Sequence, residues 1–310
     1  MKVRFWGVRG SIPTAGPKTV KYGGNTSCIE IRGDNDEVLI LDAGTGIREL
    51  GNFLIANDLK KGPLDVNVLL SHTHWDHIQG FPFFGPAFIP TSNITFYGPA
   101  TSFSGKLEDI VSGQMKYTYF PIKLSELKAK LNFKELPETT IELQPFKITT
   151  KYLNHPILTL GYRVEHNGKV FVSVYDTEPY RNHFVMEGLS EDQMDEIDEA
   201  AMKEANKYVE EMNSKIIKHI EKADLVVYDA QYRTEEYKTK KGWGHSTIDQ
   251  AIEAAVKGKV KKLALFHHDP LRTDEQLDEI QRYAKNRIKE EKGGENITVF
   301  CARERLEVTL

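Results

Sequence analysis

The sequence has no apolar stretch that could cross a membrane, because none approaches the roughly 18 consecutive apolar residues that a bilayer requires. Charged residues and a glycine stand at Lys2, Arg4 and Gly7, where a secretion signal would need an unbroken apolar core. Cysteine is scarce as well: Cys28 and Cys301 are the only two in 310 residues, which is typical of buried thiols in a reducing compartment. We therefore expect a cytoplasmic protein without membrane contact.

The chain also has no large excess of positive or negative side chains. The chain has 41 lysines and arginines against 45 acidic residues, a formal net charge of -4. Such a balance gives no attraction of the whole surface to nucleic acid or to anionic lipid, although a local basic groove would still be compatible with it. A hydrophobic content of 40% is ordinary for a globular protein with a packed core. The composition thus weighs against a general nucleic-acid binder.

No internal repeat and no low-complexity linker divides the chain, so we predict one domain over residues 1–310. A helix is expected from Thr45, and three more begin at Ser190, Thr247 and Thr273, each followed three residues later by glutamine in a capping box. Strands mixed with helices in both halves predict an α/β fold of two sheets packed face to face, with helices outside. The expected strands are residues 3–5, 28–32, 38–41, 66–70, 94–97, 147–153, 161–165, 170–175, 225–228, 263–266 and 297–301.

Two segments fit this plan less clearly. Residues 190–222 read as an acidic, amphipathic helical insertion, and residues 100–140 combine weak patterns with an aromatic cluster at 117–121. Either segment could cover an active site, form a homodimer contact or simply pack on the core as surface decoration. The sequence leaves these alternatives open.

The most informative motif is His72-x-His74-x-Asp76-His77, directly after the apolar run 66–70. A loop at the end of a buried strand holds side chains in place and still leaves them open to substrate. A lone histidine is usually a core or surface residue, but three histidines and an aspartate within six positions are not explained that way. Imidazole and carboxylate ligands suit zinc first, with manganese or iron as alternatives. The motif predicts a metal site.

This motif resembles the signature of the metallo-β-lactamase superfamily, and further pieces of that signature follow in the expected order. The resemblance implies a four-layer αβ/βα sandwich with two divalent metal ions at one edge of its sheets. It implies that Asp42 supports the metal loop without binding metal. It also implies that Asp176 bridges the two ions. The remaining ligands implied are His72, His74 and His155 for one ion, and Asp76, His77 and a last histidine for the other.

Two neighbouring histidines compete for the last ligand position. His267 comes directly after an apolar run, as the metal loop does, and we favour it on that ground. His268 is the alternative. Both cannot point inward if they continue one strand, because side chains alternate along a strand.

Two metal ions that activate a shared water serve hydrolysis of phosphodiesters, lactones, thioesters and β-lactams alike. Gly244-His245-Ser246-Thr247 narrows the choice, because it resembles the histidine motif of the phosphodiesterase branch that includes ribonuclease Z. In that branch the histidine contacts the scissile phosphate or protonates the leaving oxygen. Asp229 ends a predicted strand where that branch usually has a glutamate that orients the histidine. The residues expected to act in catalysis are thus Asp76, His245 and Asp229.

Two glycine-rich stretches, residues 5–13 and 22–27, would alone be more often simple hairpins. Together with the motifs above, they resemble a bacterial group of the superfamily associated with cyclic nucleotides and other small phosphodiesters. Such turns let backbone N–H groups approach an anion. The substrate contacts expected from these turns and from the histidine motif are Arg9, Asn25 and Ser246.

We therefore predict a hydrolase of small phosphodiesters, with a 3′,5′-cyclic nucleotide as the best guess. Ribonuclease Z fits less well, because its transfer-RNA-binding arm lies between the third histidine and the bridging aspartate. Here only 21 positions separate His155 from Asp176. RNA cleavage, lactone or ester hydrolysis, and a metal-stabilised scaffold without turnover remain the alternatives.

Overall fold

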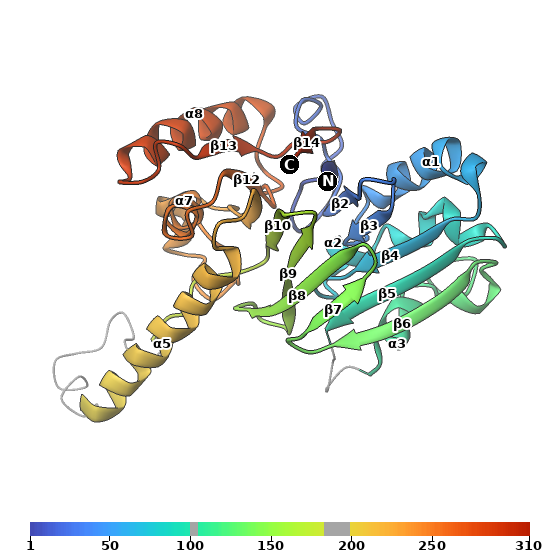
Figure 1. Cartoon of the computed structure of the whole chain (residues 1–310), viewed down its shortest axis with the longest axis horizontal. Coiled ribbons are helices and arrows are strands. Elements are labelled where there is room, and N and C mark those ends of the chain that lie inside the picture. The colour runs from blue at the N-terminus through green and yellow to red at the C-terminus, as the bar shows by residue number, and fades with distance from the viewer. Residues whose placement is uncertain (100–104, 183–198) are drawn as a thin grey trace.

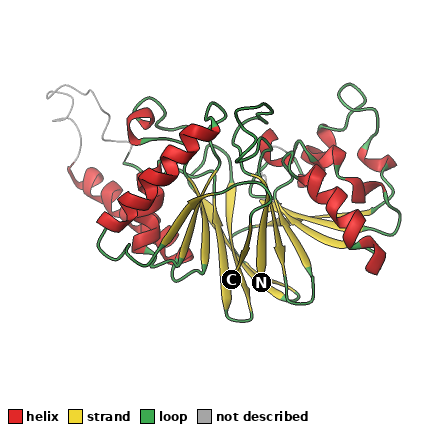
Figure 2. Cartoon of the chain, turned by 90° about the horizontal axis from the view of Figure 1, so that it is seen from above, coloured by secondary structure: helices red, strands yellow, loops and turns green. Residues whose placement is uncertain are grey.

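Two seven-stranded sheets lie face to face in the computed structural model, which describes residues 1–99, 105–182 and 199–310. Helices cover both outer sides of the pair, as Figure 2 shows. The predicted four-layer αβ/βα sandwich is thereby confirmed. The chain ends meet in the first sheet, where Lys2 pairs with Thr309, and Figure 1 shows both termini near the middle of the molecule.

Both sheets combine parallel and antiparallel pairing. The first sheet has the order β14-β1-β2-β3-β4-β5-β6, and the second β13-β12-β11-β10-β9-β8-β7. The strands of the first sheet are β1 Lys2–Gly7, β2 Cys28–Arg32, β3 Val38–Leu41, β4 Asp65–Leu69, β5 Asn93–Pro99, β6 Lys130–Leu136 and β14 Glu307–Thr309. Those of the second are β7 Thr140–Leu143, β8 Phe146–Leu153, β9 Thr159–His166, β10 Lys169–Val174, β11 Leu225–Asp229, β12 Lys262–Phe266 and β13 Thr298–Cys301.

Seven α-helices and four 3₁₀ turns are described in these three ranges. Thr247 and Thr273 cap their helices as predicted, each accepting a hydrogen bond from the backbone N–H of the glutamine three residues on. Ser190 lies outside the described residues. The helices are α1 Ile47–Asn57, α2 Trp75–Ile78, α3 Leu107–Gly113, α5 Glu199–Ile220, α6 Thr234–Tyr237, α7 Ile248–Lys257 and α8 Asp274–Glu290. The 3₁₀ turns are η1 Leu59–Lys61, η2 Phe81–Phe83, η3 Gly85–Phe88 and η4 Leu124–Glu126.

Three apolar clusters follow from the alternation of side chains along the strands. In β12, Ala264 and Phe266 point into the cluster between the sheets, while Leu263 and Leu265 point outward under α7 and α8. The third cluster lies between the first sheet and α1, α3 and the η2 turn. Because every sheet face is packed, the open edge where the strands end is the place left for a site.

The structure assigns helices and strands to parts of the two ambiguous segments. Residues 105–140 form α3, η4 and β6, which extends the first sheet beside β5 in parallel. Within 190–222 the structure describes α5, whose buried residues Ile216, His219 and Ile220 all lie near its C-terminal end. Figure 1 shows the other end of α5 projecting from the molecule. None of the helices in the described ranges is both long and apolar enough to span a bilayer.

Candidate metal centre

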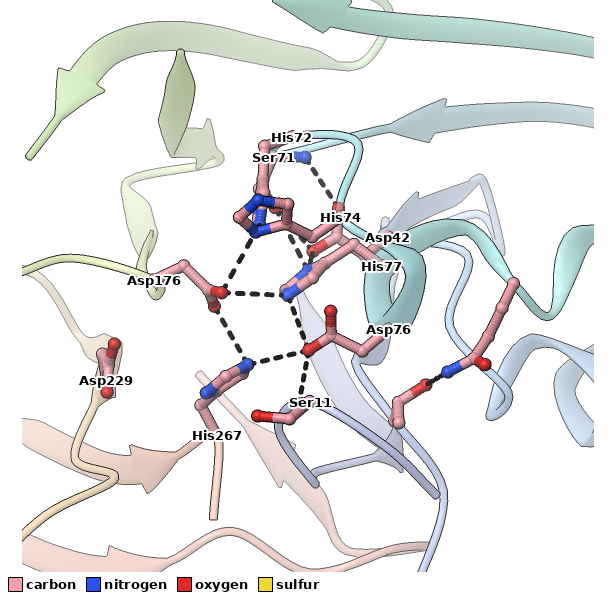
Figure 3. Close-up of polar contacts among 12 residues, drawn as sticks. Ser11, Asp42, Ser71, His72, His74, Asp76, His77, Asp176, Asp229 and His267 are labelled. Carbon is pink, nitrogen blue, oxygen red and sulfur yellow. Dashed lines mark hydrogen bonds and ion pairs between the residues drawn. The ribbon is translucent and has the colours of Figure 1, made fainter. Parts of the chain in front are cut away.

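Several strands end at one edge of the sandwich, and the residues after them turn their side chains toward one point (Figure 3). Asp42 follows β3, Asp176 follows β10 and His267 follows β12. Their φ angles are 60°, 57° and 59°, in the left-handed region that residues other than glycine adopt only at a cost. Such backbone persists only where the surrounding contacts fix it. Tight turns after buried strands therefore aim these groups.

A first group of three imidazoles gathers around one point. The Nδ1 atom of His74 lies 3.0 Å from Nε2 of His72 and 3.1 Å from Nε2 of His155. The Nδ1–H of His155 donates to the carbonyl oxygen of Gly244 at 2.9 Å, which leaves a lone pair on its Nε2. Burial lowers the pKa of His155 to about 4 and that of His72 well below its usual value. Burial also lowers the pKa of His74, so all three rings favour the neutral form that binds a cation.

A second group lies beside the first and contains two carboxylates. The Nε2 atom of His267 lies 3.1 Å from Oδ2 of Asp76 and 3.3 Å from Oδ1 of Asp176. The Nε2 atom of His77 lies 3.2 Å from Oδ2 of Asp176. That same Asp176 oxygen is 3.5 Å from Nε2 of His72, in the first group. Asp176 therefore lies between the two groups, where a carboxylate can bridge two ions.

Charge and burial in the second group fit a cation. The Nε2 atom of His77 and Oδ1 of Asp176 are buried without a hydrogen bond. Burial alone would lower the pKa of His77, but the carboxylates of Asp176, Asp76 and Asp42 together hold it well above its usual value. A proton on His77 thus compensates buried negative charge that a divalent ion would neutralise. Both groups could hold a metal ion, and their mixed nitrogen and oxygen donors suit zinc, manganese or iron.

Asp42 supports the metal loop from behind. Its carboxylate accepts hydrogen bonds from the backbone N–H and the hydroxyl of Ser71, at 2.7 and 2.8 Å. It also contacts Nδ1 of His77 at 2.6 Å, so the Nε2 atom of His77 faces the second group. This is the geometry expected of a residue that orients a ligand without contacting the ion.

His245 lies against the metal centre and is oriented by Asp229. Its Nδ1 atom is 2.8 Å from Oδ2 of Asp229, and its ring stacks on that of His267 with centroids 4.8 Å apart. Burial would lower the pKa of His245, but the buried Asp229 carboxylate raises it to about 9. Asp229 therefore reaches His245 although its side chain is shorter than the glutamate usual in the ribonuclease Z branch. The His245 ring can carry a proton beside the two groups of candidate metal ligands.

The structure also distinguishes the two candidates for the last ligand. His267 adopts the left-handed turn after β12 and points at Asp76 and Asp176. His268 lies in the interior, where its Nε2–H donates to the carbonyl oxygen of Ala302 at 2.8 Å. The geometry favours His267.

The three predicted substrate contacts remain predictions, and each of their side chains also forms hydrogen bonds within the protein. Arg9 is fully buried, and its guanidinium donates to the carbonyl oxygens of Gly23 and Arg272, both at 2.8 Å. The amide of Asn25 donates to Glu304 at 3.2 Å. The hydroxyl of Ser246 is buried and donates to the carbonyl oxygen of Thr177 at 2.7 Å. These residues fix the loops around the site, and Nη2 of Arg9 is buried without a hydrogen bond.

Sequence reasoning missed three residues that fix the site. The backbone N–H of Ser11, at a φ of 65°, donates to Oδ2 of Asp76 at 2.7 Å, and Gln231 contacts Nδ1 of His267 at 3.1 Å. The third is Glu178, a buried carboxylate two residues after Asp176.

Glu178 fastens the loop that carries His245. It accepts hydrogen bonds from the backbone N–H groups of Gly242 at 2.9 Å and Gly244 at 3.2 Å, and from the hydroxyl of Tyr237. Gly244 has a φ of 81°, and a Cβ atom there would stand 2.3 Å from Nδ1 of His155. One carboxylate thus holds the turn on which both His155 and His245 depend.

We expect Glu178→Ala to lower kcat for a phosphodiester about 10- to 100-fold, the usual effect of losing a group that orients metal ligands. Loss of the carboxylate frees the N–H groups of Gly242 and Gly244. Steady-state kinetics with measurement of bound metal test this. The matched control is Glu253→Ala, since Glu253 is an exposed glutamate on the surface of α7 that forms an ion pair with Lys257. Equal activity of the two variants would contradict the role.

Comparisons with known proteins agree with this fold. Residues 38–198 match the family model described as a beta-lactamase superfamily domain. Ribonuclease Z of Lactococcus lactis is 25% identical over 293 residues, which cover 86% of this chain and 88% of that protein.

Two solved structures share the fold. The metallo-β-lactamase fold protein YhfI of Bacillus subtilis has a TM-score of 0.65 at 18% identity, covering 99% of this chain and 98% of its own. The short form of human tRNase Z has a TM-score of 0.60 at 20% identity, covering 100% of this chain and 99% of its own.

The fold and the site define a metal-dependent hydrolase of the metallo-β-lactamase type. The chain belongs to the beta-lactamase superfamily, since the matching family model covers more than half of it. Within that superfamily the chain is similar in sequence to ribonuclease Z.

Proposed function

We propose that this chain hydrolyses a small phosphodiester, with a 3′,5′-cyclic nucleotide as the first substrate to test. The observation that carries the proposal is the His245–Asp229 pair, 2.8 Å apart, beside the two groups of candidate ligands. A phosphodiester carries a negative charge and has an alkoxide leaving group that needs a proton, and a protonated His245 meets both needs. A lactone also releases an alkoxide but is neutral, so the pair favours the anionic phosphodiester.

The proposed metal ligands are His72, His74 and His155 for one ion, and Asp76, His77 and His267 for the other, with Asp176 shared. Two divalent ions bound there would lower the pKa of a water molecule and neutralise charge on the phosphoryl oxygens. We favour zinc, with manganese and iron as the alternatives.

Three side chains orient the attacking water and supply the proton to the leaving group. Asp76 stays ionised, because the neighbouring His77 and His267 lower its pKa despite burial. It can accept a hydrogen bond from the attacking water and orient it. Asp229 accepts the Nδ1–H of His245, so the proton on Nε2 is available to the leaving oxygen. The water oxygen forms the new bond to phosphorus and its proton passes to solvent. The bond to the leaving oxygen breaks as that oxygen takes the proton of His245.

The small size of the proposed substrate is supported by the segment between His155 and Asp176. Strands β9 and β10 fill it as an antiparallel pair, with Lys169 opposite His166, and leave no chain for an RNA-binding arm. The described helix of the 190–222 insertion, α5, carries four acidic and four basic side chains and gives no net attraction to RNA.

RNA cleavage is the second candidate, because ribonuclease Z of Lactococcus lactis aligns with 86% of this chain. The metal-loaded protein should be assayed with bis(p-nitrophenyl) phosphate, 3′,5′-cyclic AMP, a structured transfer-RNA precursor and a lactone, with Asp176→Asn as the inactive control. Loss of cyclic AMP beside intact RNA supports the proposal. Cleavage of RNA beside intact cyclic AMP would instead identify the protein as a ribonuclease. Turnover of the lactone alone would overturn both the small-phosphodiester and the RNA hypotheses.

A cytoplasmic location is part of the same proposal. Both cysteines are free and buried, and they lie in different apolar clusters, Cys28 with the first sheet's helices and Cys301 with the second's. Their separation supports thiols that stay reduced.

A further inference from the structure

The loop between α6 and α7 presents a tryptophan to solvent next to the candidate catalytic histidine. Trp243 is 55% exposed, whereas Trp6 in the core is 7% exposed. Only Gly244, with a φ of 81°, separates Trp243 from the buried His245. A large aromatic ring left in water beside an active site is a binding feature more often than a packing one.

Lys240 holds this tryptophan on one face. Its ammonium lies over the Trp243 ring, 4.0 Å from the centroid, and 5.9 Å from the centroid of Tyr232. No carboxylate in the described part of the chain forms an ion pair with Lys240. The lysine therefore fixes the indole by a cation–π contact and keeps its positive charge available.

Contacts on the inner side connect this pair to the metal centre. The Tyr232 ring meets that of His245 edge-on, with centroids 6.0 Å apart, and the Tyr232 N–H donates to the carbonyl oxygen of Ser246 at 3.2 Å. Glu178 holds Gly242, the residue before Trp243, through its N–H. The indole thus stands on a fixed loop, and Lys240 connects it to the Tyr232 ring that meets His245.

We propose that Trp243, steadied by Lys240, forms a nucleobase-stacking subsite on the His245 side of the metal centre. The lysine lies over one face of the indole, and the exposed part of the ring can stack on a base whose phosphate lies at the proposed metal ligands. Stacking of a base on an aromatic side chain contributes about 1–3 kcal/mol in proteins that bind nucleic acid. The inference rests on the proposed function for the phosphate, and it adds the requirement that the substrate carry a base.

Binding of 5′-AMP and ribose 5-phosphate to the metal-loaded protein tests this, because the two differ only in the base. Calorimetry is expected to give AMP a Kd at least about fivefold lower than that of ribose 5-phosphate. Trp243→Leu should remove that preference. Lys240→Gln should weaken AMP binding about two- to fivefold through loss of the cation–π contact. AMP should also quench tryptophan fluorescence in the wild type but not in Trp243→Leu.

Two matched controls separate the subsite from general surface effects. Lys238→Gln removes another lysine of the same loop, and Tyr119→Leu removes another exposed aromatic ring, which is 76% exposed. Both should retain the preference for AMP. An unchanged preference in Trp243→Leu would overturn the subsite.

The outcome is independent of the hydrolysis assays. Trp243-dependent AMP binding by a protein that cleaves no phosphodiester would refute the proposed function and leave the subsite standing. If the wild type cleaves cyclic AMP and Trp243→Leu binds AMP normally, the proposed function is supported and the subsite is overturned. A six-residue oligoadenylate that binds more tightly than AMP would identify the base as part of an RNA, and weaker binding would identify a free nucleotide.

Discussion

Treatment with a chelator is expected to abolish phosphodiester hydrolysis and to lower the Tm by at least about 5 °C. A ligand present at 100 times its Kd stabilises the native state by about 2.7 kcal/mol, and each kcal/mol shifts the Tm of a chain this large by roughly 2–4 °C. The buried carboxylates of Asp42, Asp76 and Asp176 explain the direction. Without bound cations, their charge is balanced by protons on histidine alone.

Differential scanning fluorimetry and an assay with bis(p-nitrophenyl) phosphate, both before and after chelation, measure the two effects. Adding back zinc or manganese should restore both together. Asp176→Asn serves as the control, because loss of the bridging charge should make its Tm nearly insensitive to chelator. A chelated wild type that keeps its activity after dialysis would refute metal dependence.

The fold was largely predictable because the buried strands are short apolar runs bounded by turn residues. Three strands escaped prediction for a common reason. β6 and β7 alternate polar and half-buried residues at sheet edges, and β14 has three residues that form a strand only by pairing with β1, some 300 positions away. Their pattern is set by tertiary pairing, which one sequence does not reveal.

The candidate site was predictable where one motif or resemblance supplied the residues. The choice between His267 and His268 was not, since it depends on a left-handed turn that a non-glycine residue adopts only under tertiary constraint. Glu178 was equally hidden, because its partners Gly242 and Gly244 lie more than 60 positions away.

The prediction that Arg9 contacts substrate has a different physical basis. Glycine-rich turns do bring backbone groups close together, and the sequence suggested that an anion would fill the space between them. The structure fills it with the Arg9 guanidinium, which satisfies carbonyl oxygens that burial would otherwise leave unpaired. A buried arginine among such turns can donate hydrogen bonds to backbone carbonyl oxygens. A polar residue near a glycine turn is therefore weak evidence for substrate contact.

His245→Ala is expected to lower kcat for 3′,5′-cyclic AMP by about 10²- to 10⁴-fold while metal content stays at the wild-type value. The reason lies in the geometry: His245 contacts the proposed ligands His155 and His267 through its ring, and its hydrogen bond goes to Asp229. Metal analysis and steady-state kinetics on the same preparation give both quantities. The defect should shrink for a p-nitrophenyl ester, because that leaving group departs without a proton.

Asp229→Asn is the companion variant, because it keeps the shape of the side chain and removes the charge that holds a proton on His245. It should show the same dependence on the leaving group with a smaller loss for cyclic AMP. His166→Ala controls for removal of a histidine, since His166 lies at the end of β9 and contacts Asp34 and the carbonyl oxygen of Pro145. Wild-type turnover of cyclic AMP by His245→Ala would remove the histidine from the reaction. An equal loss for both esters would instead assign it to binding the phosphate, because only proton donation depends on how poorly the leaving oxygen departs.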